Sequence, residues 1–326
     1  MTNAVAVVIV TYNSADEIGP CLDALRRHVL QGEGTGDGVD VVVVDNASSD
    51  ATCEIVETRA PFARLIRNRS NRGFAGAVNQ AVRVTTSPLV LLLNPDADLE
   101  TGLGDLVRAF DSPEVGAAGG KLVGRSGEWQ RGFNVRSFPT PAALLMEALL
   151  VNRVWARNPV NRRYRMLDFD PRRAQDVDQP AGAFLMFRRE VWEKLDGLDE
   201  AFHPIWFEDV DLCWRIRESG ARILFVPGAV ARHEGGHSLR GASVRFRQLA
   251  WYGSFLRFCN KHFSGGAFQV LRAATAVGLC VRWCACWGAG SSNDRKAYSS
   301  ALKMVMGSQA AHNVSANVGP APIVES

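Results

Sequence analysis

The chain has 326 residues, of which 47% are hydrophobic and 22% charged, and its formal net charge at pH 7 is +3. This length and apolar content suffice for one large α/β domain or two smaller ones, each with a buried core. The nearly balanced charge gives no support to a dedicated nucleic-acid-binding protein. The seven cysteines are scattered and odd in number, and we find no signal peptide before them, so we expect reduced thiols and a cytoplasmic catalytic domain.

Apolar runs that end in polar turns alternate with helical patterns through the first half of the chain. Such runs are typical of strands buried on both faces, as in a parallel sheet. The helical segments between them favour right-handed β-α-β crossovers, and the first helix is expected to be capped near Asn13 or Ser14. We therefore predict an α/β fold with strands at residues 4–10, 41–44, 63–67, 89–93, 115–122, 183–187 and 221–226.

The segment 89–98 is where we first expect a site. Its apolar run ends in Asn94-Pro95-Asp96-Ala97-Asp98, and ligands of open α/β sheets bind beyond the carboxyl ends of the strands. Asp96 and Asp98 could hold a divalent cation and a diphosphate there. The alternative is a pair of turn aspartates that only accept hydrogen bonds from backbone amides. The position after a buried strand favours the metal.

Further polar residues follow the other predicted strands. Thr11-Tyr12-Asn13 and Asp45 could contact a nucleoside, and the helix that begins near Arg72 and Gly73 favours an anion such as a diphosphate. The chain has no Gly-Lys-Ser/Thr sequence in this glycine-containing turn and no Gly-x-Gly-x-x-Gly turn after the first strand. The absence of both motifs argues against the hypothesis that the protein is a dehydrogenase.

Acidic residues stand at the amino end of a helix predicted in the second half. Glu208 and Asp209 precede a helical apolar stripe, where they could act only as capping and dipole partners. One of them could instead be a general base. His233 follows the last predicted strand and would close over the same edge of the sheet. A cation, a diphosphate leaving group and a general base together fit a group-transfer reaction.

Residues 124–179 break the regular pattern and include seven arginines between positions 153 and 173. The arginines suit an anionic surface or ligand, and a flexible surface loop is the alternative. The apolar stretches 141–151 and 267–287 could lie on a membrane surface or pack against the domain, and the second fits an amphipathic helix better than a spanning one. The small and polar residues from about Gly288 predict a disordered tail.

Five motifs occur in order within residues 4–240. They are Val8-Ile9-Val10-Thr11-Tyr12-Asn13, Val42-Val43-Val44-Asp45-Asn46-Ala47-Ser48-Ser49-Asp50, Asn71-Arg72-Gly73-Phe74-Ala75 with Asn79, Asn94-Pro95-Asp96-Ala97-Asp98, and Glu208-Asp209-Val210-Asp211-Leu212. In this set the chain resembles glycosyltransferase family 2. Within the family it is most similar to the rhamnosyltransferases of actinobacterial cell-wall assembly. Those enzymes move rhamnose from dTDP-rhamnose to decaprenyl-diphosphate-linked N-acetylglucosamine, in the linker between peptidoglycan and arabinogalactan.

The resemblance implies a GT-A fold, which is a Rossmann-like, mixed but mainly parallel sheet with helices on both faces, and an inverting single displacement. Carried over by motif, the donor would contact Thr11, Tyr12, Asn13, Asp45, Arg72, Gly73, Asn79 and Asp96. Asp98, helped by Asp96 and completed by His233, would bind Mg²⁺ or Mn²⁺. Asp209 would take the proton of the acceptor hydroxyl. Glu208 and His237 are secondary candidates for base and metal ligand.

The resemblance also implies an organisation and partners. Residues 1–123 would be the nucleotide-sugar-binding half and 124–240 the acceptor-binding and catalytic half of one domain. A helical, membrane-associated segment would follow at 241–290, and a disordered tail at 291–326. The expected partners are a nucleotide-sugar donor, a polyprenyl-diphosphate sugar acceptor and the cytoplasmic face of the cell membrane, to which the protein would bind peripherally; an oligomer is compatible with this.

Other functions stay open at this point. A family 2 enzyme could use another nucleotide sugar for a different cell-surface polysaccharide. A sugar nucleotidyltransferase would carry a glycine-rich loop with Arg and Lys after the first strand, where this chain has Thr11-Tyr12-Asn13-Ser14. A non-catalytic sugar-nucleotide or lipid-binding module would need no acidic pair at Glu208-Asp209. The chain also lacks the Gln-x-x-Arg-Trp motif of processive synthases, so we expect one sugar per acceptor.

Overall fold

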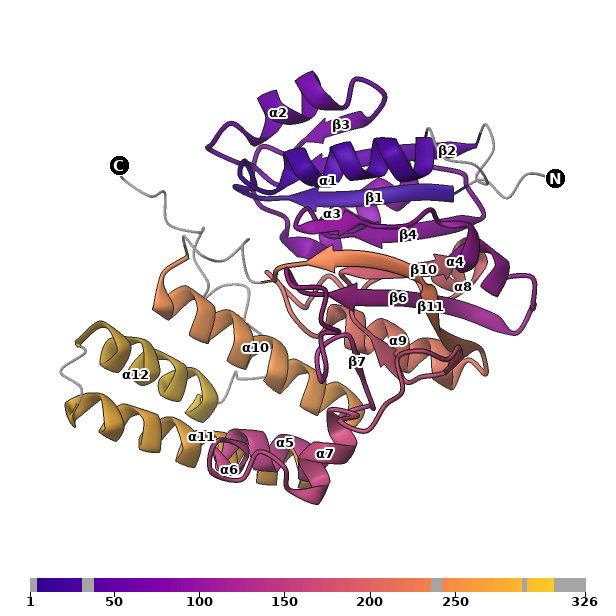
Figure 1. The fold of residues 1–326 in the computed structure, drawn as a ribbon. Coiled ribbons are helices and arrows are strands. Elements are labelled where there is room, and N and C mark those ends of the chain that lie inside the picture. The colour runs from indigo at the N-terminus through magenta and orange to yellow at the C-terminus, as the bar shows by residue number, and fades with distance from the viewer. Residues whose placement is uncertain (1–4, 31–37, 236–241, 289–291, 308–326) are drawn as a thin grey trace.

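The computed structural model describes residues 5–30, 38–235, 242–288 and 292–307 (Figure 1). Within these residues, nine strands form one sheet in the order β3-β2-β1-β4-β10-β6-β11-β5, with β8 paired to β11. The strands are β1 Val5–Thr11, β2 Val39–Asp45, β3 Arg64–Arg67, β4 Leu89–Leu93, β5 Ala97–Leu99, β6 Val115–Val123, β8 Gln175–Asp176, β10 Phe184–Arg188 and β11 Arg222–His233. β3, β2, β1 and β4 are parallel, as are β6 and β11, whereas β10 and β5 run antiparallel to their neighbours. The predicted α/β fold with a mixed, mainly parallel sheet is confirmed.

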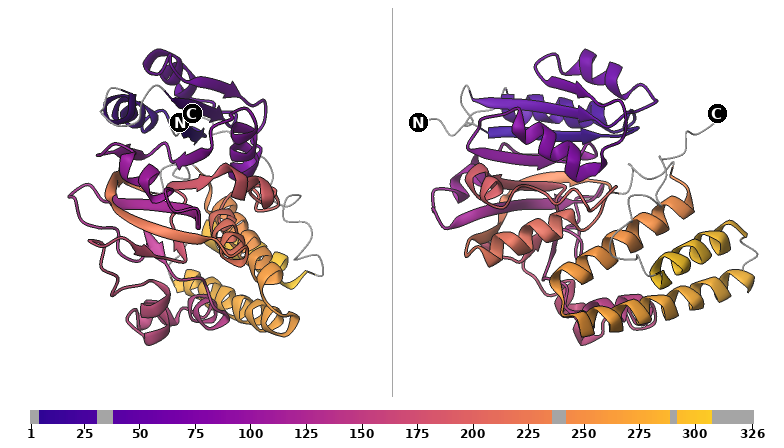
Figure 2. Two further views of the ribbon diagram at one scale, coloured as in Figure 1. Left: turned by 90° about the vertical axis from the view of Figure 1, so that its right-hand side faces the viewer. Right: turned by 180° about the vertical axis from the view of Figure 1, so that it is seen from behind.

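Helices cover both faces of this sheet, so the strands have two cores. Val7 and Val43 belong to the core under α1 Ile18–Leu25, α2 Thr52–Arg59 and α4 Gly104–Ala109, and a short π-helix, η1 Arg26–Leu30, extends α1. Val8 and Val42 belong to the core under α3 Gly73–Arg83, α8 Arg189–Lys194 and α9 Glu208–Glu218. Figure 2 shows the two helical layers from the side and from behind. Burial on both faces explains why these strands are apolar without alternation.

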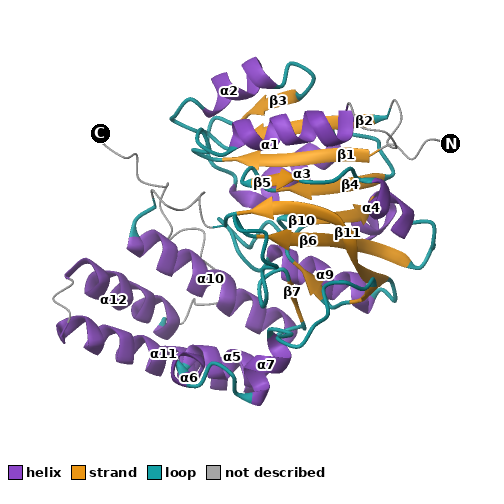
Figure 3. Ribbon diagram, in the orientation of Figure 1, coloured by secondary structure: helices purple, strands orange, loops and turns teal. Residues whose placement is uncertain are grey.

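The remaining helices lie beside the sheet, where a third core forms (Figure 3). They are α5 Pro141–Ala148, α6 Val151–Val154, α7 Pro159–Tyr164, α10 Val244–His262, α11 Gly265–Gly288 and α12 Ser292–Met306. Side chains of α5, α9, α10, α11 and α12 pack together there, with the aromatic rings of α10 at the centre. A two-stranded sheet of β7 Val135–Arg136 and β9 Gln179–Pro180 joins the two ends of the irregular segment 124–179.

Two sequence expectations about the ends of elements are wrong. Residues 292–306 form α12 rather than a disordered tail, because Ala297, Ala301 and Val305 lie one turn apart and bury one face of the helix. The first helix begins at Ile18, since the Asn13 side chain accepts the N–H of Ser49 at 2.8 Å and is not available as its cap. The sequence from residue 308 onwards lies outside the described residues.

The pairing of β11 with β5 has the largest consequence for the site. β11 continues past an irregularity between Val226 and Val230 and ends at His233, which lies opposite Ala97 of β5. β5 follows β4 after a tight turn that contains Asp96. A residue from late in the sequence is thereby brought to the carboxyl end of a central strand.

Candidate active site

A cavity of about 550 Å³ lies at the carboxyl ends of β1, β2 and β4. The loops after these strands, the start of α3, the loop before α9, the end of β11 and parts of α5 and α10 form its wall. Among the residues predicted from the sequence, the wall includes Thr11, Tyr12, Asn13, Asp96, Glu208, Asp209 and His233, whereas Asp45, Arg72, Gly73, Asn79 and Asp98 lie outside it. His237 lies outside the described residues.

The ends of β1 and β2 are joined by hydrogen bonds. Thr11 and Asp45 are paired in the sheet, and Thr11 Oγ1 donates to Asp45 Oδ1 at 3.0 Å. Asp45 Oδ2 accepts the N–H of Ser48 at 2.9 Å, and Ser48 Oγ accepts that of Asn13 at 2.8 Å. Asp45 is therefore buried in contacts that hold the Tyr12 loop, and its neighbour Asn46 faces the cavity instead.

The start of α3 is held in an unusual backbone conformation. Gly73 has a φ of +75°, and a Cβ atom there would lie 2.7 Å from His203 Nδ1. Asn46 fixes this turn: its Oδ1 accepts the N–H of Arg72 at 3.2 Å, and its Nδ2 donates to the Gly73 carbonyl at 3.0 Å. Gly73 is thus required for the shape of the turn, whereas Asn71 and Phe74 contribute the side chains to the cavity wall.

Asn79, which the motif predicts as a donor contact, lies outside the cavity wall. Its side chain donates to the Leu198 carbonyl at 2.8 Å and to Glu200 Oε1 at 3.0 Å, and its Oδ1 accepts the N–H of Leu198 at 3.0 Å. The amide is buried and its hydrogen bonds tie α3 to the loop before α9. These contacts give Asn79 a structural role outside the cavity wall, and a contact with the donor stays a prediction.

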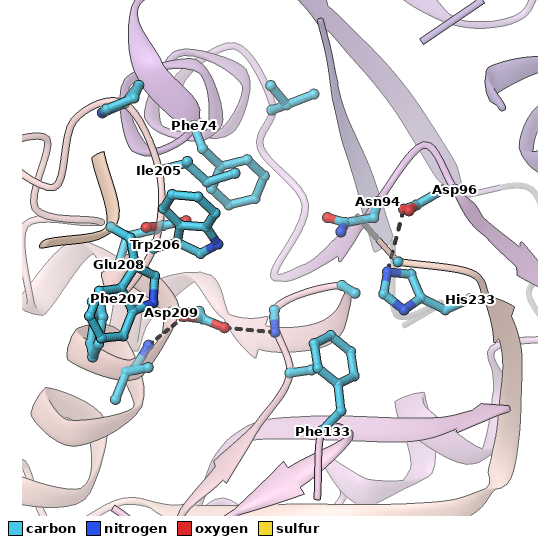
Figure 4. A pocket seen from close by; sticks show the side chains of 18 of the residues that line it. Phe74, Asn94, Asp96, Phe133, Ile205, Trp206, Phe207, Glu208, Asp209 and His233 are labelled. Atoms are coloured by element: carbon cyan, nitrogen blue, oxygen red, sulfur yellow. Dashed lines mark hydrogen bonds and ion pairs between the residues drawn. The ribbon is translucent and has the colours of Figure 1, made fainter. Parts of the chain in front are cut away.

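Asp96 and His233 meet on one side of the cavity. His233 Nε2 lies 3.4 Å from Asp96 Oδ1 (Figure 4). The imidazole stacks on Phe133, with ring centroids 5.3 Å apart, and its Nδ1 lies 3.2 Å from Gln130 Oε1. Both side chains are buried, and their orientation is fixed by these neighbours.

This pair has the chemistry to hold a divalent cation. A carboxylate and an imidazole are suitable ligands for Mn²⁺, and Mg²⁺ is commonly bound by one or two carboxylates plus substrate phosphates. Within the described residues, no group of three or more His, Cys, Asp or Glu side chains could hold a metal alone. The residues therefore fit a cation that is shared with a diphosphate.

Asp98, which the sequence predicts as a metal ligand together with Asp96, is not part of the cavity wall. It lies on β5 opposite Arg232 of β11 and outside the cavity wall. Burial raises its pKa, and the nearby charge of Arg232 acts in the opposite direction. The carboxylate that lies beside His233 is that of Asp96, and a metal-binding role for Asp98 stays a prediction.

Glu208 and Asp209 begin α9 on the opposite side of the cavity (Figure 4). Asp209 Oδ2 accepts the N–H of Gly182 at 3.0 Å, and Oδ1 accepts that of Val210 at 2.8 Å. Burial raises the pKa of Asp209, and these backbone hydrogen bonds and the charge of Arg136 act against that rise. A partly buried carboxylate with a raised pKa at a cavity wall is suited to accept a proton.

Glu208 has a different environment. Only 4% of the residue is exposed, and its Oε2 has no hydrogen-bond partner within the described residues. Burial, followed by the charge of Asp209, raises its pKa well above the ordinary range of glutamate. Both carboxylate oxygens of Asp209, in contrast, accept a backbone N–H, which makes Asp209 the better-positioned candidate for a base of the two.

The sequence did not identify several residues of the wall. Arg136 lies on β7, Gln179 on β9 and Gly182 between β9 and β10, and they carry no recognisable local pattern. Asn94 could have been predicted from the sequence, because it precedes Asp96 in the same polar turn.

Comparisons with known proteins agree with this geometry. The family described as glycosyl transferase family 2 matches residues 6–196. The N-acetylglucosaminyl-diphospho-decaprenol L-rhamnosyltransferase of Mycobacterium tuberculosis is 28% identical over 73% of this chain and 78% of that protein. The pre-mycofactocin glycosyltransferase of the same species is 26% identical over 76% of this chain and 46% of that protein.

A solved structure shows the same fold. The mannosyltransferase PcManGT from Pyrobaculum calidifontis, in complex with GDP-Man and Mn²⁺, has a TM-score of 0.55 and 20% sequence identity. The match covers 96% of this chain and 84% of that one.

Proposed function

The chain belongs to glycosyl transferase family 2 and is a glycosyltransferase, and we propose that it transfers rhamnose from dTDP-rhamnose to N-acetylglucosamine on a polyprenyl diphosphate. The observation that carries the reaction type is one cavity with Asp96 and His233 on one side and Asp209 on the other. The 28% identical relative from Mycobacterium tuberculosis supports the sugar and the acceptor. The product would enter cell-wall linker synthesis, the arabinogalactan to peptidoglycan connection.

The proposed reaction is a single displacement. A hydroxyl oxygen of the acceptor forms a bond to the anomeric carbon of the donor sugar, and the bond from that carbon to the diphosphate breaks on the opposite face. The proton of the hydroxyl passes to Asp209. Gly182 and Val210 hold the carboxylate in place through their N–H groups, and a positioned base of this kind contributes about 10² to 10⁴ in rate.

The polar side of the cavity would bind the donor. Tyr12, Asn46 and Asn71 line the part next to β1 and β2, where the nucleoside would lie. Asp96 and His233 would hold Mg²⁺ or Mn²⁺ beside the diphosphate. When bound, such a cation stabilises the negative charge that develops on the leaving diphosphate.

We also propose that the protein binds peripherally to the cytoplasmic face of the membrane. Within the described residues, 265–287 of α11 are long and apolar enough to cross a bilayer. The two arginines of this stretch donate to backbone carbonyls of the protein, Arg272 to Val305 at 2.7 Å and Arg282 to Ala148 at 3.2 Å. Val270, Val277 and Val281 are more than half exposed, so α11 has one face against the protein and an apolar one outward, as expected for a helix lying on a membrane.

The test is a donor and acceptor panel. Purified protein is incubated with dTDP-, UDP- and GDP-sugars and polyprenyl-diphosphate-N-acetylglucosamine, with Mn²⁺ or Mg²⁺ and with EDTA. We expect metal-dependent transfer from dTDP-rhamnose alone. Transfer from a different donor would refute the rhamnose assignment, and transfer that is unchanged by EDTA would refute the role of the cation.

A further inference from the structure

The cavity has an apolar end that the donor does not explain. Leu144 of α5, Phe246 and Trp251 of α10 and Phe207, which precedes α9, line it; we call these four residues the aromatic wall. The Phe207 and Trp251 rings lie 6.2 Å apart at their centroids, and Trp251 stacks on Phe255 at 5.1 Å with an interplanar angle of 16°. The wall is therefore held by packing within the protein.

Two arginines lie along the same cavity. Arg136 is close enough to Asp209 for its charge to lower the pKa of that carboxyl. Arg136 donates through Nε to the Gly132 carbonyl at 2.8 Å, and its two terminal nitrogens make no hydrogen bond within the described residues. Arg165 lies 3.6 Å from Glu147 Oε2, and both of these residues also line the cavity. Guanidinium groups at a cavity wall are suited to recognise phosphate oxygens.

The aromatic wall adjoins the helix that has an apolar outer face. Leu144 belongs to α5, and the Ala148 carbonyl at the end of α5 accepts the hydrogen bond from Arg282 of α11. On α11, Val270, Val277 and Val281 are exposed. Apolar surface is thus available first inside the cavity and then on the outside of the neighbouring helix.

We propose that the acceptor lies along the cavity with its hydroxyl at Asp209, its diphosphate between Arg136 and Arg165, and its first isoprene units on the aromatic wall. This inference rests on the proposed function. It follows from the three kinds of group in one cavity wall, a carboxylate, guanidinium groups and apolar side chains, which suit the sugar hydroxyl, the diphosphate and the lipid of the acceptor. A sugar acceptor without a lipid would leave the wall without a ligand, and a lipid without a diphosphate would leave the guanidinium groups without one.

The first experiment varies the lipid. Transfer is measured to the methyl and farnesyl esters of N-acetylglucosamine diphosphate in detergent, and the ratio of their kcat/KM values is the readout. Burial of several isoprene carbons predicts a farnesyl preference of about tenfold to hundredfold in the wild type. Trp251→Ala and Phe246→Ala should each reduce that ratio by about fivefold or more. Trp155→Ala, which removes an exposed tryptophan outside the cavity, is the matched control and should keep the wild-type ratio.

The second experiment varies the phosphate. Farnesyl diphosphate and farnesyl monophosphate esters of N-acetylglucosamine are compared in the same way, with Arg165→Met and, as matched control, Arg163→Met, whose side chain is exposed on α7. We expect Arg165→Met to lower the preference for the diphosphate by about tenfold and Arg163→Met to leave it unchanged.

The outcomes separate the two levels of the proposal. Equal rates with the methyl and farnesyl esters would overturn the lipid assignment and leave the rhamnosyltransferase function intact. The lipid assignment would also be overturned if Trp251→Ala and Phe246→Ala, shown to be folded by thermal melting, kept the wild-type ratio of kcat/KM values. No transfer to any ester by a protein that still binds dTDP-rhamnose in calorimetry would overturn the proposed function together with this inference.

Discussion

Replacement of Asp209 by asparagine removes a negative charge and keeps the size of the side chain. In the wild type, one carboxylate oxygen accepts the N–H of Gly182 at 3.0 Å and the other accepts that of Val210 at 2.8 Å. Asparagine has one side-chain oxygen, so one of these N–H groups would face an NH₂ group. An unsatisfied donor costs about 1–3 kcal/mol, which is less than the roughly 5–15 kcal/mol that stabilises a typical domain. We therefore expect Asp209→Asn to fold.

The effect on turnover should be larger than the effect on stability. Loss of a general base lowers the rate by at least about 10²-fold, which corresponds to roughly 2.7 kcal/mol in the activation free energy. Donor affinity should stay within a few-fold, because Asp96 and His233 lie on the other side of the cavity. Initial rates of transfer, calorimetry with the donor and thermal melting measure the three quantities separately.

A matched control distinguishes this role from a general effect of the exchange. Asp170→Asn also alters a carboxylate that accepts a backbone N–H, that of Arg172 at 3.1 Å, but it lies outside the cavity. It should keep wild-type turnover. Turnover of Asp209→Asn within a few-fold of the wild type would refute the assignment of the base. Because burial raises the pKa of Asp209, the acid limb of the wild-type kcat profile should also lie above the ordinary titration range of aspartate.

Asp96→Asn should lose the cation-dependent part of donor affinity in calorimetry with and without Mn²⁺, whereas Asp98→Asn should keep it. Equal losses in the two variants would contradict the proposal that Asp96, rather than Asp98, holds the cation. Burial raises the pKa of Glu208, so the folded state binds the Glu208 proton more tightly than the unfolded state does. The contribution of this proton to the stability of the fold is present at low pH and is lost as the pH rises through the folded-state pKa. Glu208→Gln removes this titration, and its melting temperature relative to the wild type should therefore increase as the pH rises above the ordinary titration range of glutamate; a constant difference would argue against a raised pKa. Asn79→Ala should lower the free energy of unfolding by about 1–3 kcal/mol with unchanged donor affinity, and weaker donor binding in a folded variant would restore the donor-contact role.

The local pattern of the sequence determined the central sheet and one edge of the site. The runs that became β1, β2, β4 and β6 are apolar because both of their faces are buried, and this composition is visible without a structure. Parallel strands share one carboxyl edge, so Tyr12 and Asp96 could be expected to meet there. The start of α9 at Glu208 could be predicted for a similar reason, because its helical stripe is local.

Only the tertiary structure decided which side chains complete the site. The pairing of β5 with β11 brings His233 to Asp96, and no local preference reveals a contact between residues so far apart in the chain. The hydrogen bonds of Asn79 likewise depend on a distant loop. Arg136 reaches the cavity because β7 pairs with β9 across an irregular segment. Periodicity records which face of an element is buried, whereas these contacts depend on how separate elements pack, and that information is spread over the whole chain.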